Sequence, residues 1–526
     1  MHSGSLALLL HAHLPFVRHP EYEEFHEEDW LFEAVVETYL PLLRILRQYV
    51  VEKLPVRLTL TLTPTLCAML RDPLLQTRTV RYLDRGIEFS RQEVERTRLD
   101  SGRHALARFY LARLTASRKF YQDELARDLV AAFAQLQRDG VVEIITCAAT
   151  HGFLPLMEEF PEAIRAQILI ARDDYRECFG RDPVGVWLPE CAYVPGVEKF
   201  LHEANLRWFV VDAHGLMYGT PRPPLAIFSP CCTPAGPVVF ARDRESSRQV
   251  WSSRDGYPGD PAYRDFYRDV GQELPEELLA RVYPEVGHRR NTGIKYHRVT
   301  GHEPKELYRR DWALGAVESH AHHFLQSRIA QLQSLAGLLP VEPLLLSPFD
   351  AELFGHWWFE GPDFLDSFLR KAAQRADVLH LTTPTRHLEA HPTMPVVTPS
   401  ASSWGNHGYW EVWLNDTNAW IYPHLHEAAR RMTAAAREGV ASGRPDSDRR
   451  LRQMARELLL AQSSDWAFLM KTGTAREYAE RRTRDHLLRF SRLDELPPEA
   501  NSSNPLLAAC EERDNLFPNL NWQYYA

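Results

Sequence analysis

LALLLHAHLPF (residues 6–16) joins an unbroken apolar run to two histidines that are spaced by one residue. A strand covered on both faces of a parallel sheet has such a run, because neither of its faces meets solvent. Residues i and i+2 of a strand project from the same face, so His11 and His13 should point together. The stretch predicts a buried parallel strand with two imidazoles at its carboxyl end.

Five later segments resemble this strand, and each ends in polar residues: 56–64, 141–152, 184–190, 208–215 and 343–355. Helical patterns such as 164–179 and 319–338 separate them. Alternating strands and helices predict an α/β fold, here a distorted TIM-like (β/α)7 barrel. Sites in such barrels lie at the carboxyl ends of the strands. These ends carry His11, His13, Glu190, Asp212, His214 and Asp350.

The remaining segments read as helical. Residues 71–139 are rich in Arg and Glu and contain no strand candidate, and the chain after residue 403 is also mostly helical. Its amphipathic rhythm is seen in Leu451, Met454, Ala455, Leu458 and Leu459. We therefore predict a barrel domain formed by residues 1–70 and 141–395, an inserted helical domain at 71–140, and a helical C-terminal domain at 396–526.

Composition excludes several classes of protein. The net charge of −9 argues against a surface that neutralises nucleic acid or anionic lipid. The seven cysteines form neither a disulfide framework nor a CxxC pair. The N-terminal segment lacks a basic stretch, and no apolar run approaches the roughly 20 residues of a membrane span. We expect a monomeric cytoplasmic protein.

The histidine pair allows three interpretations. His11 and His13 could bind zinc, with His151 or the pair Asp212 and His214 completing the site. They could instead form a polar wall that hydrogen-bonds sugar hydroxyl groups. They could also be satisfied histidines at the rim of a barrel, with no chemical role. The residues alone do not decide between these.

Two carboxylates follow apolar strands. Glu190 lies in WLPECAY (residues 187–193), and Asp350 lies in SPFDAELFGHWWFEGP (residues 347–362). A carboxylate in such a position is either solvated or held in a partly dry pocket that raises its pKa. Cleavage of a glycosidic bond requires two carboxyl groups, one as nucleophile or base and one as acid.

Tryptophans are frequent in polar stretches, namely Trp30, Trp251, Trp404, Trp410, Trp413 and Trp466. The apolar face of a pyranose stacks on a flat ring, and an indole N–H can bind a hydroxyl group. This composition is typical of oligosaccharide grooves. The alternative is that the rings attach the C-terminal helices to the barrel, which we expect for about half of them.

Together these stretches resemble glycoside hydrolase family 57, and within it the 1,4-α-glucan branching enzymes. The resemblance covers nearly the whole chain, and the motifs occur in the family's order. They are HAHLPF (residues 11–16), TLTPTL (61–66), WLPECAY, SPFDAELFGHWWFEG, SSWGNHGYWEVWLN (402–415) and QSSDWAF (462–468).

The resemblance implies a retaining mechanism on an amylose-like or glycogen-like α-glucan, with no metal and no cofactor. Glu190 would be the nucleophile and Asp350 the acid and base, with carboxyl groups about 5–5.5 Å apart. The C-terminal domain would contribute to the substrate groove. The substrate-binding residues would be His11, His13, Trp30, His151, Asp212, His214, Arg242, Trp251, Gly259, Trp404, Trp413 and Asp465.

One stretch departs from the branching enzymes. In SPCCTPAGPVVFARD (residues 229–243), Cys231 or Cys232 stands where a loop tyrosine is expected. An α-amylase or 4-α-glucanotransferase of the same family is therefore the main alternative. A zinc-dependent deacetylase or mannosidase using the histidine pair, and a non-catalytic glucan-binding protein, are more remote alternatives.

Overall fold

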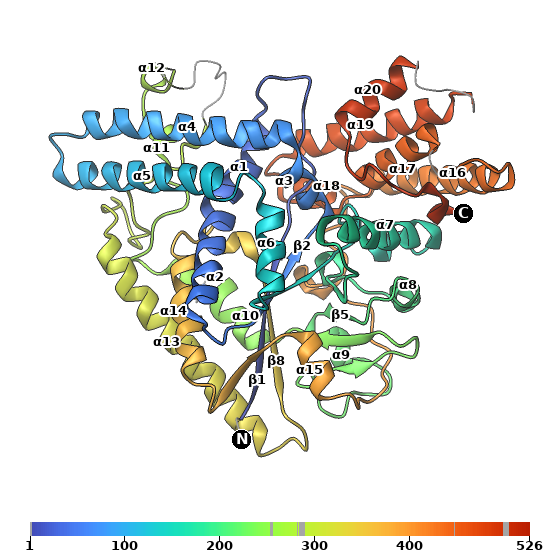
Figure 1. Cartoon of the computed structure of the whole chain (residues 1–526), viewed down its shortest axis with the longest axis horizontal. Coiled ribbons are helices and arrows are strands. Elements are labelled where there is room, and N and C mark those ends of the chain that lie inside the picture. The colour runs from blue at the N-terminus through green and yellow to red at the C-terminus, as the bar shows by residue number, and fades with distance from the viewer. Residues whose placement is uncertain (1–2, 253–255, 281, 283–289, 446–447, 498–503) are drawn as a thin grey trace.

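The computed structural model describes residues 3–252, 256–280, 282, 290–445, 448–497 and 504–526 (Figure 1). One sheet is entirely parallel, with β1 at its centre between β2 and β8, β3 beside β2, and β9 paired with the start of β1. The strands are β1 (Gly4–Ala12), β2 (Leu58–Leu62), β3 (Val142–Ile145), β8 (Leu344–Asp350) and β9 (Leu379–Thr382).

A second sheet has the order β4-β5-β7-β6. Its strands are β4 (Gly185–Val186), β5 (Trp208–Val211), β7 (Val238–Ala241) and β6 (Cys231–Cys232), and only the pair β6 and β7 is antiparallel. At one seam the Trp187 N–H donates to the Thr146 carbonyl at 2.9 Å. At the other, the Asp243 N–H donates to the Leu346 carbonyl at 2.7 Å.

The predicted α/β fold with parallel strands and a helix-rich C-terminal region is confirmed. The seven strands β1, β2, β3, β4, β5, β7 and β8 follow one another in the order of a barrel, but the two seams have only isolated backbone contacts. A continuous ladder around a closed barrel is therefore not formed among the described residues.

Strand β1 is buried along all nine residues, which explains its unbroken apolar run. Its register with β8 sets His11 beside Asp350, and its register with β2 sets His11 beside Thr61. Because all three strands are parallel, their carboxyl ends meet at one edge. The pairing of β1 with β8 thus places His11 next to the carboxylate of Asp350, which lies 339 residues later in the chain.

Helices cover the sheets on both sides. The first part of the chain forms α1 (Asp29–Ala34), a π-helical turn η2 (Val35–Tyr39), α2 (Leu40–Glu52), α3 (Pro64–Arg71), α4 (Pro73–Arg96), α5 (Ser101–Lys119), α6 (Leu129–Arg138), α7 (Pro161–Phe179), α8 (Val197–Glu203), α9 (Ala213–Met217) and α10 (Arg244–Trp251). The middle part forms α11 (Val270–Glu273), α12 (Glu276–Leu279), α13 (Arg310–Ala336), α14 (Gly361–Ala373) and α15 (Pro384–Ala390).

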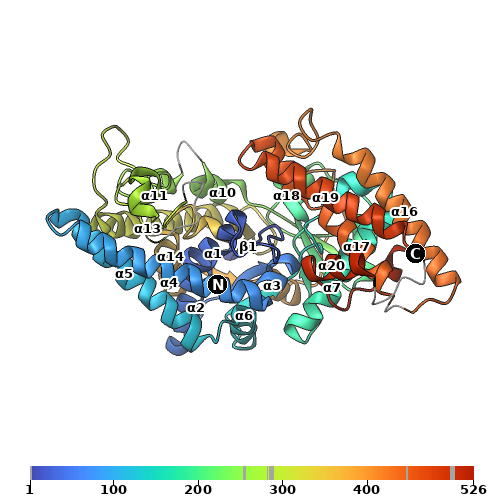
Figure 2. The ribbon, with the colours of Figure 1, turned by 90° about the horizontal axis from the view of Figure 1, so that it is seen from above.

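The C-terminal helices are α16 (Ile421–Ala441), α17 (Arg449–Ala461), α18 (Ser464–Thr472), α19 (Arg476–Asp494) and α20 (Pro505–Arg513). Figure 2 shows α4 and α5 on one flank and α16 to α20 on the other, with the N-terminal elements between them. The predicted amphipathic face of α17 is buried, as Leu451, Met454 and Leu458 are 0% exposed. Among the described helices, none combines the length and apolarity needed to span a membrane.

Candidate active site

Glu190 lies in a short 3-10 turn (Pro189–Cys191) directly after β4. Its backbone has φ 61° and ψ 24°, a left-handed conformation that costs a non-glycine residue roughly 1–3 kcal/mol. Both its main chain and its side chain are fixed from the C-terminal region. The Trp404 N–H donates to the Glu190 carbonyl at 3.0 Å, and the Trp404 indole donates to Oε2 at 2.8 Å. Ser464 Oγ donates to Oε1 at 3.0 Å.

Asp350 is the last residue of β8, and the charges of Glu190 and Glu352 are near it. Burial and the two neighbouring carboxylates raise the pKa of Asp350 well above its usual value, against the opposing charge of Arg242. Burial also raises the pKa of Glu190, but the Trp404 and Ser464 donors counteract it. Among the described residues, none hydrogen-bonds the Asp350 carboxyl group. The two environments therefore differ, and Asp350 holds its proton more tightly.

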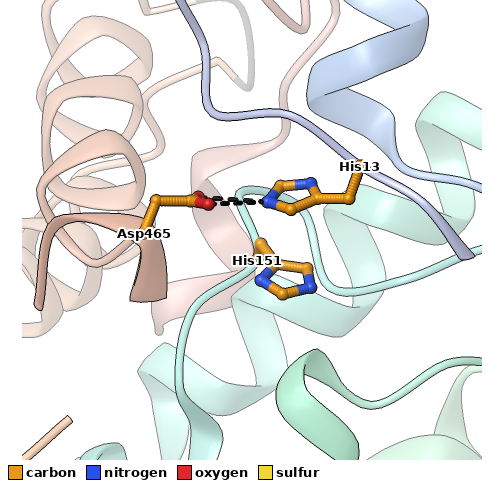
Figure 3. A group of neighbouring side chains, drawn as sticks. All are labelled: His13, His151 and Asp465. Atoms are coloured by element: carbon orange, nitrogen blue, oxygen red, sulfur yellow. Dashed lines mark hydrogen bonds and ion pairs between the residues drawn. The ribbon is translucent and has the colours of Figure 1, made fainter. Parts of the chain in front are cut away.

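Three histidine rings form a wall at this edge, and His11 and His13 lie together as their spacing predicts. His11 Nε2 lies 3.1 Å from His151 Nε2, and the rings of His13 and His151 stack with centroids 3.8 Å apart. His13 Nε2 donates to the Asp465 carboxylate at 3.1 Å, as Figure 3 shows. Burial opposes the charge of Asp465, but the His13 imidazole lowers the pKa of Asp465 to about 2. His13 and Asp465 thus form a part-buried ion pair within the wall.

One possible ligand atom from each of His13, His151 and Asp465 lies within 4.8 Å of the other two, a spacing that could suit a metal ion. The ring planes of the two histidines meet at only 13°. A metal lies in the plane of each imidazole that binds it, about 2.0–2.1 Å from the nitrogen. Two nearly parallel, stacked rings cannot both satisfy this for one ion. This ligand set does not fit the zinc interpretation.

A second polar group borders the carboxylates. Asp212 follows β5, and its Oδ1 lies 3.1 Å from His214 Nδ1, while His214 Nε2 lies 2.8 Å from the Gly408 carbonyl. Both acceptors can only accept, so both ring nitrogens donate and His214 is an imidazolium. The hydrogen bond that His214 donates to Asp212 accordingly raises the pKa of His214. Arg242 lies 3.4 Å from Asp212 Oδ2 and over the Trp404 ring.

The other predicted contact residues are placed differently. Trp30 meets Tyr478 edge-on at 5.9 Å, and Trp251 ends α10 with 41% of its surface exposed. Gly259 ends a 3-10 turn beside open space. Trp413 is only 2% exposed and stacks on Phe153 at 4.5 Å. Its ring is thus covered by protein, as expected for tryptophans that attach the C-terminal region.

Cys231 and Cys232 do not lie at the site. They form β6 and pair with Val239 and Val238, at the amino end of β7, whereas Arg242 follows its carboxyl end. The cysteines therefore do not take the position of a loop residue at the catalytic edge. The expectation failed because one sequence does not reveal where the strand β7 starts.

Three polar residues of the site were not predicted from the sequence. Ser464 contacts both Glu190 and His151, and it directly precedes Asp465. Glu352 accepts the backbone N–H of His13 at 3.2 Å and the hydroxyl group of Tyr39. Ser464 and Glu352 lie within motifs that were chosen for other residues, whereas Tyr39 lies in none of them and carries no sequence signal.

Residues 7–399 match the model of glycosyl hydrolase family 57, and residues 424–525 match that of the 1,4-alpha-glucan branching enzyme C-terminal region. The 1,4-alpha-glucan branching enzyme of Thermococcus kodakarensis is 34% identical over 98% of this chain and 77% of its own.

Two solved structures are similar over nearly their whole length. The alpha-amylase AmyC of Thermotoga maritima is 41% identical, with a TM-score of 0.92 and 99% of each chain covered. The branching enzyme of Pyrococcus horikoshii is 33% identical, with a TM-score of 0.89, covering 99% of this chain and 97% of its own. The match over residues 7–399, together with the fold and the paired carboxylates, shows that the chain belongs to glycosyl hydrolase family 57.

Proposed function

We propose that this protein is a 1,4-α-glucan branching enzyme with Glu190 as nucleophile and Asp350 as acid and base. The observation that carries the proposal is that the surroundings of the two carboxyl groups favour different protonation states. Glu190 accepts hydrogen bonds from Trp404 and Ser464, whereas Asp350 is left in a setting that favours its protonated form. A retaining reaction needs this division between an anionic nucleophile and a protonated acid.

In the first step a Glu190 carboxylate oxygen attacks C1 of an α-1,4-linked glucosyl unit. The C1–O4 bond breaks, and the Asp350 proton moves to the departing O4, which leaves a β-glucosyl ester on Glu190. In the second step the 6-hydroxyl group of another glucan chain attacks C1 and gives its proton to Asp350. The ester bond breaks, Glu190 is released, and an α-1,6 branch has formed.

The buried wall of His11, His13 and His151 supports the glucosyl unit that is transferred in this proposal. Imidazole nitrogens offer donors and acceptors for sugar hydroxyl groups. The ion pair between His13 and Asp465 fixes one ring, and Ser464 fixes the His151 ring. Such fixed groups lower the entropic cost of orienting the reacting carbon.

Hydrolysis of α-1,4-glucan is the second candidate. It differs from branching only in that water intercepts the glucosyl ester. The similarity to the T. maritima alpha-amylase, at 41% identity, favours it. The match of residues 424–525 to the branching-enzyme C-terminal model favours branching, because that region supplies Asp465 and Ser464. A third candidate is 4-α-glucanotransferase activity, in which the 4-hydroxyl group of another glucan chain intercepts the same glucosyl ester.

The deciding experiment is proton NMR of amylose incubated with the purified protein, with reducing ends counted in parallel. New α-1,6 anomeric signals with few new reducing ends would support branching. New reducing ends without α-1,6 signals would replace that proposal with hydrolysis. Redistributed chain lengths without either change would indicate α-1,4 transfer.

Three further assignments belong to this proposal. The natural substrate is an amylose-like or glycogen-like chain, and the protein acts as a cytoplasmic monomer. Residues 1–70 and 141–395 form the catalytic domain, residues 71–140 an inserted domain, and residues 396–526 a domain that completes the groove. The hydrogen bonds of Trp404 and Ser464 to Glu190 support the last of these.

A further inference from the structure

A pair of stacked aromatic rings lies at the surface beyond the carboxyl end of β8. The indole of Trp357 stacks on Phe266, with ring centroids 4.5 Å apart and an interplanar angle of 27°. Trp357 is 51% exposed, and the adjoining Tyr267 is 80% exposed. Lys295 Nζ lies 4.3 Å from the centre of the Phe266 ring and supports it from the protein interior. The exposed indole is therefore held in a fixed orientation.

Packing does not explain why a tryptophan stands at this position. Its neighbour Trp358 is 1% exposed and forms part of the apolar core against Phe364. Trp357 faces the other way and keeps half of its large surface in solvent. An indole that is exposed and yet held by a second ring is arranged as a preformed contact surface.

The aromatic pair is tied to the catalytic edge by two hydrogen-bonded links. The Trp357 N–H donates to the Glu352 carbonyl at 3.2 Å, and the Glu352 carboxylate accepts the backbone N–H of His13. The adjacent His356 binds Glu37 at 2.8 Å, and Glu37 lies on the same π-helical turn as Tyr39, which also binds Glu352. The aromatic pair and the histidine wall thus share supports.

The His356 ring lies 5.4 Å from both Phe266 and Trp357, and a carboxyl group lies on its other side. Glu33 lies on α1, with Oε2 3.8 Å from His356 Nδ1. Burial and the charges of Glu37 and Asp29 raise the pKa of Glu33 well above its usual value. A protonated carboxyl group both donates and accepts hydrogen bonds. A flat ring with the polar groups of His356 and Glu33 nearby offers what a pyranose needs, namely an apolar face and mixed polar partners.

We propose that Trp357, stacked on Phe266 and bordered by His356, is a glucan subsite outside the catalytic centre. It binds a glucosyl unit of the chain whose scissile bond lies between Glu190 and Asp350. This inference rests on the proposed function for its substrate class, but it concerns binding rather than bond exchange. It predicts that Trp357 increases the affinity for long glucan chains and does not affect the chemistry at C1.

The test measures binding by titration calorimetry in the Glu190→Gln background, with maltooligosaccharides of increasing length and with amylose. Trp357→Ala should weaken binding of long chains roughly 3- to 10-fold, and leave the shortest ligands that bind unaffected. Trp357→Phe should restore part of the loss, and Glu33→Gln should lower affinity less than Trp357→Ala. Trp312→Ala is the matched control, since Trp312 is also 49% exposed but lies at the start of α13.

Equal affinities of Trp357→Ala and its parent for every chain length would overturn the subsite. So would a loss that is the same for the shortest and longest ligands, because it would indicate a general structural effect. The outcome is separable from the proposed function. A protein that binds long glucan through Trp357 but forms no branches keeps the subsite and loses the branching proposal, whereas no glucan binding at all would overturn both.

Discussion

The indole N–H of Trp404 donates to Oε2 of Glu190 at 2.8 Å across a sequence separation of 214 residues. A donor of this kind stabilises the carboxylate form and lowers its pKa. The segment after the strands therefore favours the charged form of Glu190, in the turn that follows β4. Removing the indole donor of Trp404 is the most direct test of the roles assigned to the two carboxyl groups.

Trp404→Phe keeps an aromatic ring beside His11 and Trp187 but removes this donor. A hydrogen bond to a charged group contributes about 1.5–3 kcal/mol, so kcat/KM should fall roughly 10- to 100-fold. The acid limb of the activity profile should also move to higher pH, because Glu190 then takes up its proton more readily. Trp358→Phe is a control of equal size change, since the buried Trp358 Nε1 has no hydrogen-bond partner among the residues that the structure describes. An unmoved acid limb would contradict the role of Trp404.

Glu190→Gln should reduce turnover on amylose by roughly 10⁴-fold or more, because the amide cannot form the glucosyl ester. Affinity for amylose and the melting temperature should stay close to those of the wild type. Glu203→Gln on α8 is the matched control, because Glu203 pairs with Arg165 away from the site. Turnover by Glu190→Gln near the wild-type rate would show that another residue is the nucleophile.

Activity against pH should follow a bell under conditions in which chemistry limits the rate. Glu190 must be ionised to attack, and burial raises its pKa, so the acid limb should lie above the usual range of a glutamate. Asp350 must be protonated to assist departure of the sugar O4. Its pKa is raised more than that of Glu190, and the loss of its proton sets the alkaline limb of the profile. A profile that stays flat from about pH 4 to about pH 9 would contradict the pairing.

Treatment with a strong chelator should leave turnover unchanged. The stacked rings of His13 and His151 cannot converge on one ion, and both ring nitrogens of His214 already donate to oxygens. Metal analysis of the active protein should therefore give substoichiometric zinc. Loss of activity on chelation, restored by added zinc, would revive the metal-dependent alternatives.

The sequence predicted elements whose pattern is long enough to be unambiguous. The apolar run of β1 and the rhythm of α17 both produced the expected burial. The short strands β7 and β9 were not predicted, because four residues carry no periodicity that distinguishes a strand from a loop. β4 contains only two residues, since the chain turns at Pro189 into the strained conformation of Glu190.

The site was predictable where one local rule applied. The spacing of His11 and His13 placed two rings together because alternate strand residues share a face. Trp404 and Trp413 lie in one aromatic loop, yet one binds Glu190 and the other stacks on Phe153. No local pattern distinguishes them, because the difference arises from what the fold places against each ring, Glu190 in one case and Phe153 in the other. Position in the fold, rather than residue type, decides such cases.

Asp350→Asn should stabilise the protein increasingly as the pH rises. The folded-state pKa of Asp350 is raised by burial and by Glu352 and Glu190, so the folded protein binds this proton more tightly than the unfolded chain. The stability that this difference provides is complete below the unfolded pKa, about 3.9, and is lost as the pH rises through the folded pKa. Asparagine does not ionise and avoids that loss.

The melting temperature of Asp350→Asn relative to the wild type should therefore grow from about pH 4 to about pH 8, although turnover is lost. Asp139→Asn, at an exposed position after α6, is the matched control for the loss of one carboxyl group. Calorimetric scans of the three proteins across this range provide the measurement. A constant offset for Asp350→Asn would mean that Asp350 releases its proton as readily in the folded protein as in the unfolded chain. It would then lack the property that suits it to protonate a departing sugar.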